Sequence, residues 1–222
     1  MNFGSVFAEA TPMLFQGFLV TLETTILSLI VAFFLGLISC LMGMSSIKPL
    51  KAISRFYIWI IRGTPVIVQC FFIYFGLPQL IQALGPDFRL TAFTAGVITL
   101  FLNAGAYMSE IFRGGIQAVD PGQMEAARSL GLPKSRAMIK VILPQALRIV
   151  TPSLVNQFII TLKDTSIISV ISLADIVYQA QIYIGRTMNS FATWTVVGLF
   201  YLAGITCLSM LSRYLERRMA YE

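Results

Sequence analysis

The sequence contains no histidine, and charged residues make up only 12% of its 222 residues. Without histidine, the chain lacks the side chain used most often for general acid–base catalysis and the commonest metal ligand. It also has no G-x-x-x-x-G-K phosphate-binding loop and no G-x-S-x-G nucleophile elbow. We therefore expect a protein that is not an enzyme and that binds no metal ion and no cofactor of its own.

Cysteine is scarce as well. Cys40, Cys70 and Cys207 all lie in apolar stretches and lack the spacing of metal ligands, so we interpret them as packing thiols. With 57% hydrophobic residues, the low charge content excludes a soluble domain of this size. No basic segment precedes the first apolar stretch, which we therefore expect to be a membrane span and not a cleaved signal peptide.

Long apolar runs indicate an integral membrane protein. A hydrocarbon core of about 30 Å is crossed by about 20 helical residues. Five runs reach that length, at residues 12–43, 53–77, 90–112, 139–162 and 194–211. We expect an all-α fold with five transmembrane helices in a single domain covering residues 1–222, with a core at about 12–215. The segment 166–184 is apolar but interrupted by Asp175, and we interpret it as a half-buried or re-entrant piece.

The basic residues predict the orientation of the chain in the membrane, because Lys and Arg concentrate in cytoplasmic loops. An outward N-terminus and an inward C-terminus place most of the 16 basic residues on the inner side. These inner residues are Lys48, Lys51, Arg55, Arg62, Arg113, Arg128, Lys134, Arg136, Lys140, Arg148, Arg213, Arg217 and Arg218. The net charge of +6 is then explained by anionic membrane lipid, and no nucleic acid partner is needed.

One inner loop has the signals of a short helix at residues 120–131. Asp120 suits the N-cap, Pro121 the first helical position and Gly131 the C-terminal cap. A helix of about ten residues is not stable alone in water, so it needs contacts with other surfaces. From these residues alone, an ordinary connecting loop is an equally good interpretation.

The spacing of this loop resembles a known motif. Glu125-Ala126-Ala127, then Gly131 after three residues, then Val141-Ile142-Leu143-Pro144 after nine more, is similar to the EAA loop of ABC importer permeases, with Val141 where that pattern has Ile. The segments R-G-T-P-V-I-V-Q at 62–69, N-A-G-A-Y-M-S-E-I-F-R-G at 103–114 and K-D-T-S-I at 163–167 resemble permeases for polar amino acids of the His/Gln/Arg/cystine type. The resemblance covers nearly the whole chain and implies the type I importer fold.

The resemblance also implies partners and a coupling site. In that family the short cytoplasmic helix is a coupling helix that fits into a cleft on a separate ATP-hydrolysing subunit. We expect two ATP-binding subunits that hold ATP and Mg, a second permease subunit (identical or paralogous), an extracytoplasmic substrate-binding protein, and a multi-pass location in a prokaryotic inner membrane. The residues expected to couple this chain to the ATPase are Glu125, Ala126, Ala127, Arg128, Gly131, Leu143 and Pro144.

Polar residues inside the spans are candidates for the substrate pathway, because ionisable groups are unfavourable there. Asn103, Tyr107 and Glu110 are spaced by four and three residues and share one helix face. That face could bind the ammonium and carboxylate groups of an amino acid, or it could hold helices together by hydrogen bonds. Glu110 is also expected to pair with Arg113 one turn away. The full candidate set is Glu23, Asn103, Tyr107, Glu110, Lys163, Asp164 and Thr165.

Two other functions are compatible with a polytopic chain. A secondary transporter would need inverted repeats and its own ion-coupling site, and we find no such repeat. An intramembrane enzyme would need a nucleophile–base pair or metal ligands, which the absence of histidine disfavours. The sequence leaves open which amino acid is carried and whether the permease pairs with itself or with a paralogue.

Overall fold

The computed structural model describes residue 4 and residues 6–220, which form helices and short loops with no strand; the side chains of residues 211–212 and 215–220, with those of Arg217 and Arg218 among them, lie outside the described part. The main helices are α2 (Thr11–Met44), α3 (Lys48–Arg62), α4 (Val66–Phe71), α5 (Leu77–Ala83), α6 (Ala92–Ala118), α7 (Pro121–Ser129), α8 (Lys134–Ala137), α9 (Leu143–Ile168), α10 (Ile176–Thr187) and α11 (Ser190–Ala220). Single π-helical or 3-10 turns extend them at Val6–Ala10, Phe72–Gly76, Met138–Ile142 and Ser169–Ile171.

Within the described residues, five helical segments are long and apolar enough to cross a membrane. They run from Val6 to Met44, Val66 to Ala83, Ala92 to Ala118, Lys134 to Ile171 and Ser190 to Met210. The expected all-α class and the five spans are therefore confirmed. The second run was misplaced, however, and the fourth was predicted too short at both ends.

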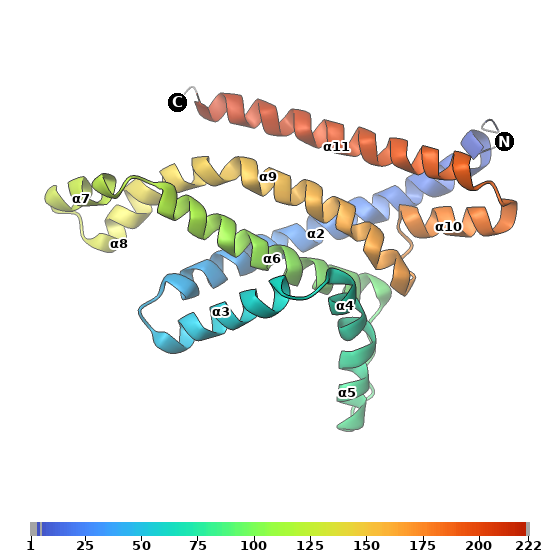
Figure 1. Cartoon of the computed structure of the whole chain (residues 1–222), viewed down its shortest axis with the longest axis horizontal. Helices are drawn as coiled ribbons and strands as arrows, with labels where there is room; N and C mark the ends of the chain where they lie inside the picture. Colours follow the sequence, from blue (N-terminus) through green and yellow to red (C-terminus); the bar gives the residue numbers. More distant parts are fainter. Residues whose placement is uncertain (1–3, 5, 221–222) are drawn as a thin grey trace.

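The second run was misplaced because its first half is too polar and its middle is broken. α3 carries four basic residues and does not qualify as a span. Pro65 lacks a backbone N–H, and the helix that ends at Arg62 resumes only at Val66. Beyond it, α4 and α5 turn away from α3 and project from the side of the bundle (Figure 1).

The fourth span runs through both of its prolines and extends beyond the predicted run at each end. Pro144 lies in the first turn of α9, where a missing N–H is tolerated, and Pro152 lies inside the helix without terminating it. After α9 the chain turns, and Asp175 caps α10 by accepting a hydrogen bond from the Tyr178 N–H at 2.8 Å. α10 has 12 residues, too few to cross a membrane, and it packs beside α2, as expected for a half-buried piece.

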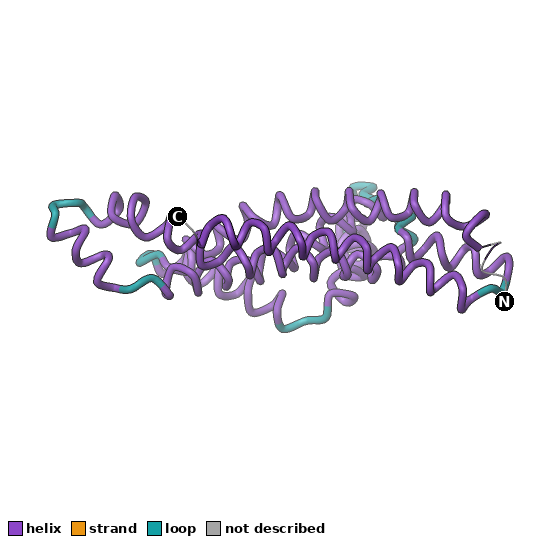
Figure 2. Tube along the Cα trace, turned by 90° about the horizontal axis from the view of Figure 1, so that it is seen from above, coloured by secondary structure: helices purple, strands orange, loops and turns teal. Residues whose placement is uncertain are grey.

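The core lies along α6, which packs against α2 on one side and α9 on the other (Figure 1). The buried contacts here join Ala32 of α2, Met108 of α6 and Val150 of α9. A Cβ atom at Gly36 would approach the carbonyl oxygen of Gly105 to 2.9 Å, so glycine is needed where α2 and α6 come closest. Seen from above, the long helices form an elongated, flattened bundle (Figure 2).

The two ends of this bundle differ in what they carry. Figure 1 shows the α2–α3 connection, α7 and α8 at one end, with the C-terminal part of α11 directed toward it. The start of α2 and the whole of α10 lie at the opposite end. The predicted inner basic loops therefore gather at one end of the molecule, which is the arrangement that the expected orientation requires.

Candidate functional site

The helix expected at 120–131 is α7, and its N-terminus is built as the sequence indicates. The Asp120 carboxylate accepts a hydrogen bond from the Gly122 N–H at 2.7 Å, and the backbone carbonyl of Asp120 accepts from Gln123. Pro121 occupies the first helical position. These contacts satisfy free N–H groups of the first turn and fix where the helix begins.

Gly131 ends α7 in a left-handed conformation, with φ at +84°. The Gly131 N–H donates to the carbonyl of Arg128 at 2.9 Å, and the Leu132 N–H donates to the carbonyl of Ala127 at 3.1 Å. This pair of bonds is a Schellman motif, and it needs a residue that tolerates positive φ. α7 is therefore a short helix whose two ends are both fixed by capping hydrogen bonds.

One face of α7 is held against the rest of the chain. Ala127 is only 4% exposed, and Met124 packs against Val119 and Ile142. The Gln145 side chain donates to Gln123 at 3.4 Å and to the carbonyl of Val141 at 2.9 Å, which ties the start of α9 to α7.

The opposite face of α7 is open. Glu125, Ala126 and Arg128 are exposed, and so is Gly131. Leu130 is 85% exposed, which is unusual for a leucine side chain. The sequence interpretation did not single out Leu130, although its place between the Glu-Ala-Ala triplet and Gly131 could have suggested it. Leu143 is half-buried and Pro144 is exposed. Both lie in the first turn of α9, so they are not part of the open face of α7.

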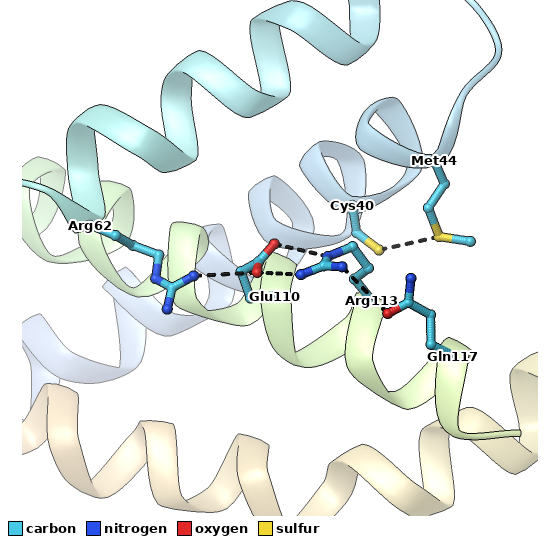
Figure 3. Close-up of polar contacts among 6 residues, drawn as sticks. All are labelled: Cys40, Met44, Arg62, Glu110, Arg113 and Gln117. Atoms are coloured by element: carbon cyan, nitrogen blue, oxygen red, sulfur yellow. Dashed lines mark hydrogen bonds and ion pairs between the residues drawn. The ribbon is translucent and has the colours of Figure 1, made fainter.

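A second polar feature lies where α3 meets α6, and Glu110 is its centre. The Glu110 carboxylate accepts from Arg113 at 2.6 and 3.1 Å, which confirms the expected pair one turn away. It also lies 3.3 Å from the guanidinium of Arg62 at the end of α3. Figure 3 shows both arginines directed at this one carboxylate from opposite sides.

The same face of α6 continues through Tyr107 and Asn103. The Arg62 guanidinium lies 5.2 Å from the centre of the Tyr107 ring, a cation–π distance. The buried Asn103 side chain donates to the side-chain oxygen Oε1 of Gln69 at 3.1 Å. Gln69 in turn donates to the backbone carbonyls of Ile61 and Thr64, at 2.7 and 3.0 Å. The partners Arg62 and Gln69 were not among the predicted site residues, although both lie in the segment 62–69 that was noted for its resemblance.

The other candidates lie apart from this face. Glu23 is exposed on α2, and Lys163 is exposed near the end of α9 beside a half-buried Asp164. Thr165 is buried, and its hydroxyl donates to the carbonyl of Leu162 at 2.6 Å. Within the described residues, no hydrogen bond or ion pair joins Glu23, Asp164 or Thr165 to Glu110. The structure thus links Asn103, Tyr107 and Glu110 through Gln69 and Arg62, and leaves the remaining candidates separate.

The polar face of α6 could bind a ligand, and α7 could contact another protein. The part of the chain that the structure describes has no group of three or more Cys, Asp and Glu side chains that could hold a metal ion. The face through Asn103 and Glu110 offers amide, carboxylate and guanidinium groups. α7 offers a stiff, capped element with a mixed polar and apolar surface.

Comparison of the sequence with known proteins gives consistent matches. Residues 35–221 match the family model described as "Binding-protein-dependent transport system inner membrane component". The chain is 36% identical over 208 residues to an arginine transport system permease protein of Bacillus subtilis (strain 168), covering 94% of this chain and 93% of that one. It is 39% identical over 210 residues to a glutamine transport system permease protein of Escherichia coli (strain K12), covering 95% and 94%.

Comparison of the structure agrees. A chain from the crystal structure of an amino acid ABC transporter with histidines matches with a TM-score of 0.91 and 43% identity, over 98% of this chain and 99% of that one. A chain of the MetNI methionine ABC transporter in an inward-facing conformation matches with a TM-score of 0.77 over 94% of this chain and 97% of that one, at 17% identity. The second match shares the fold alone.

Proposed function

The chain belongs to the family of binding-protein-dependent transport system inner membrane components, and on this premise we propose how it takes part in transport. It is the permease subunit of an ABC importer for polar amino acids, a multi-pass component of the inner membrane that does not itself catalyse a reaction. Relatives named for glutamine and arginine transport, together with the 43% identical amino acid transporter, support a substrate of this class.

α7 is the coupling helix in this proposal. Its two capped ends make it a rigid element, and a rigid element transmits displacement that a flexible loop would absorb. Its open face carries Glu125, Ala126 and Arg128 beside the exposed Leu130. We propose that this face fits into a cleft on an ATP-binding subunit, with Ala126 and Gly131 allowing close approach. Leu143 and Pro144, at the start of α9, transmit the movement of α7 to the membrane bundle.

The complete importer needs subunits in addition to this chain. We propose two ATP-binding subunits, which hold ATP and Mg, and a second permease subunit, identical or paralogous, because five spans are too few to enclose a pathway. A substrate-binding protein delivers the amino acid at the outer face. The N-terminus lies outside and the C-terminus inside, as the basic loops at the α7 end of the bundle favour. The whole chain, 1–222, acts as a single permease domain.

The substrate pathway is proposed along the polar face of α6. Glu110 and Asn103 offer groups that match an amino acid's ammonium and carboxylate, and Tyr107 lies between them along the helix. Lys163, Asp164 and Thr165 near the end of α9, and Glu23 on α2, are further candidates that a second subunit could bring toward this face. Glu110 already has two guanidinium partners, so a substrate ammonium would have to displace or share one of them.

The single observation that carries the coupling proposal is the doubly capped α7 with an open face. Its test is uptake of labelled glutamine, arginine and histidine into proteoliposomes that contain the complete importer. We expect uptake that needs ATP and the ATPase subunits, and we expect Glu125→Lys to abolish it while membrane insertion stays normal. Uptake by the permease without any ATPase would support a secondary transporter instead. Normal uptake by the Glu125→Lys importer would contradict the role of α7.

A further inference from the structure

The basic residues of α3 form a stripe, of which the transport proposal uses only the last member, Arg62. Lys48, Lys51, Arg55 and Arg62 follow one another at spacings of three, four and seven residues, which places them on one helix face. The same helix also exposes large apolar side chains, since Trp59 is 70% exposed and Phe56 and Ile53 are exposed as well. α3 runs back beside α2 and α6 from the α2–α3 connection, so its N-terminal half lies toward the end of the bundle that carries α7 and α8 (Figure 1).

The middle of this stripe borders a polar cleft of about 580 Å³ between α2, α3 and α6. Lys51, Arg55 and Trp59 line it from α3, and Arg113 and Gln117 line it from α6. Figure 3 shows Arg113 and Gln117 along one side of α6, next to the α2 residues Cys40 and Met44. The cleft therefore collects hydrogen-bond donors from two helices that are far apart in the sequence.

The charges in the cleft are unbalanced. Glu110 is the one acidic residue that lines it, and its carboxylate is already held by Arg62 and Arg113. Among the described residues, no carboxylate pairs with Lys51 or Arg55. The hydroxyls at its base are also engaged, because Ser54 donates to the Ser39 carbonyl at 2.7 Å. Two cations without a carboxylate partner, in one cleft with a third cation, Arg113, make an anion site.

We infer that this cleft binds the phosphate group of an anionic membrane lipid, with Lys51 and Arg55 as its principal ligands. Phosphate presents several acceptor oxygens, which match the ammonium of Lys51 and the planar guanidinium of Arg55. A lipid fits better than a free phosphate ion, because exposed Phe56 and Ile53 flank the stripe where acyl chains would pack. Basic pockets between helices at the cytoplasmic surface hold lipid headgroups in this way.

The experiment uses the purified importer complex, stripped of lipid in detergent and titrated with phosphatidylglycerol, phosphatidylcholine or inorganic phosphate. Bound lipid is counted by native mass spectrometry. We expect saturable binding of phosphatidylglycerol, weaker binding of phosphatidylcholine, and no competition from inorganic phosphate at the same concentration. The double variant Lys51→Gln/Arg55→Gln should bind phosphatidylglycerol about 30-fold more weakly, at about 1 kcal/mol per cation.

The matched control is Lys140→Gln/Arg148→Gln, which removes two exposed cations that do not line the cleft. It should bind phosphatidylglycerol like the unmodified complex, and the charge-preserving Lys51→Arg should do the same. Equal losses in the cleft and control variants would overturn the site, since general surface charge would then explain binding. Competition by inorganic phosphate, or by a free amino acid, would overturn the lipid as its ligand. The readout is lipid binding, so it stands whether or not the transported substrate is as proposed.

Discussion

The guanidinium of Arg62 lies 3.3 Å from the carboxylate of Glu110, and this ion pair fastens the last residue of α3 to the middle of α6. The same guanidinium lies over the ring of Tyr107 at 5.2 Å. The helix break that follows Arg62 is thus anchored to α6 directly before the chain turns away. Glu110 in turn holds Arg113, so one carboxylate organises two cations from different helices.

The first prediction concerns this ion pair. We expect Arg62→Gln to lower the unfolding free energy by about 0.5–1 kcal/mol, because both side chains are partly exposed and solvent weakens the pair. In a double-mutant cycle, Arg62→Gln in a Glu110→Gln background should lower it by less. Arg89 pairs with Asp87 at 3.5 Å on an exposed loop, and Arg89→Gln serves as the matched control with no measurable effect. Thermal unfolding of the purified complex measures all four variants, and strict additivity would show that the pair contributes nothing.

The second prediction concerns Gln69, which bridges the break. Gln69→Leu leaves the carbonyls of Ile61 and Thr64 and the buried amide of Asn103 without a partner. We expect this variant to be destabilised by about 2 kcal/mol, since an unsatisfied buried polar group costs about 1–3 kcal/mol. Gln79→Leu, an exposed change of the same chemistry on α5, should leave the midpoint of thermal unfolding nearly unchanged. If the two variants unfold at the same temperature, the hydrogen bonds of Gln69 do not contribute to stability.

The third prediction concerns Gly131. Valine at this position meets a φ of +84°, which strains a β-branched residue by about 1–2 kcal/mol and would disturb the Schellman motif that ends α7. We expect Gly131→Val to uncouple ATP hydrolysis from uptake, while Gly131→Asn, which tolerates positive φ, keeps most of the activity.

The control for Gly131 is Gly85→Val. Gly85 also has positive φ, at +119°, but it lies in the loop after α5. A Cβ atom there would meet nothing within 4 Å, and the same is true at Gly131. Both valine variants therefore carry backbone strain, but at different places in the fold. Uptake per ATP hydrolysed, measured in proteoliposomes, should fall only for Gly131→Val; an equal fall in both would point to general destabilisation.

The fourth prediction concerns Asp175 at the start of α10. This carboxyl is fully buried, one of its oxygens has no hydrogen-bond partner among the described residues, and burial raises its pKa from 3.8 to about 7. The folded chain therefore holds the proton more tightly than the unfolded chain. Its contribution to stability is greatest below about pH 4 and is lost as the pH rises through 7.

Asp175→Asn tests this, because asparagine can still accept the Tyr178 N–H but does not titrate. The variant should gain stability relative to the unmodified protein as the pH rises from 5 to 8. Asp87→Asn, at an exposed site, should follow the unmodified protein throughout. The midpoint of thermal unfolding at each pH is the measurement, and parallel curves for Asp175→Asn and the unmodified protein would contradict a protonated Asp175.

The features that sequence reasoning predicted well are those that depend on neighbouring residues. The caps at Asp120 and Gly131 follow from side chains two or three positions away, and the Glu110–Arg113 pair lies within one helical turn. The second span was misplaced because the apolar run at 53–77 was taken as a single helix. Arg55, Arg62 and the break at Pro65 divide that run, and the span begins only at Val66.

The sequence by itself determined the membrane location, the number of spans and the capped α7, because hydropathy and helix capping act over short stretches of chain. Only the tertiary structure decided that Arg62 meets Glu110, that Gln69 meets Asn103, and that Lys51 and Arg55 share a cleft with Arg113. Those contacts join residues 34 or more positions apart. They depend on how closely α2, α3 and α6 pack, and glycines such as Gly36 set that approach in a way that no local pattern encodes.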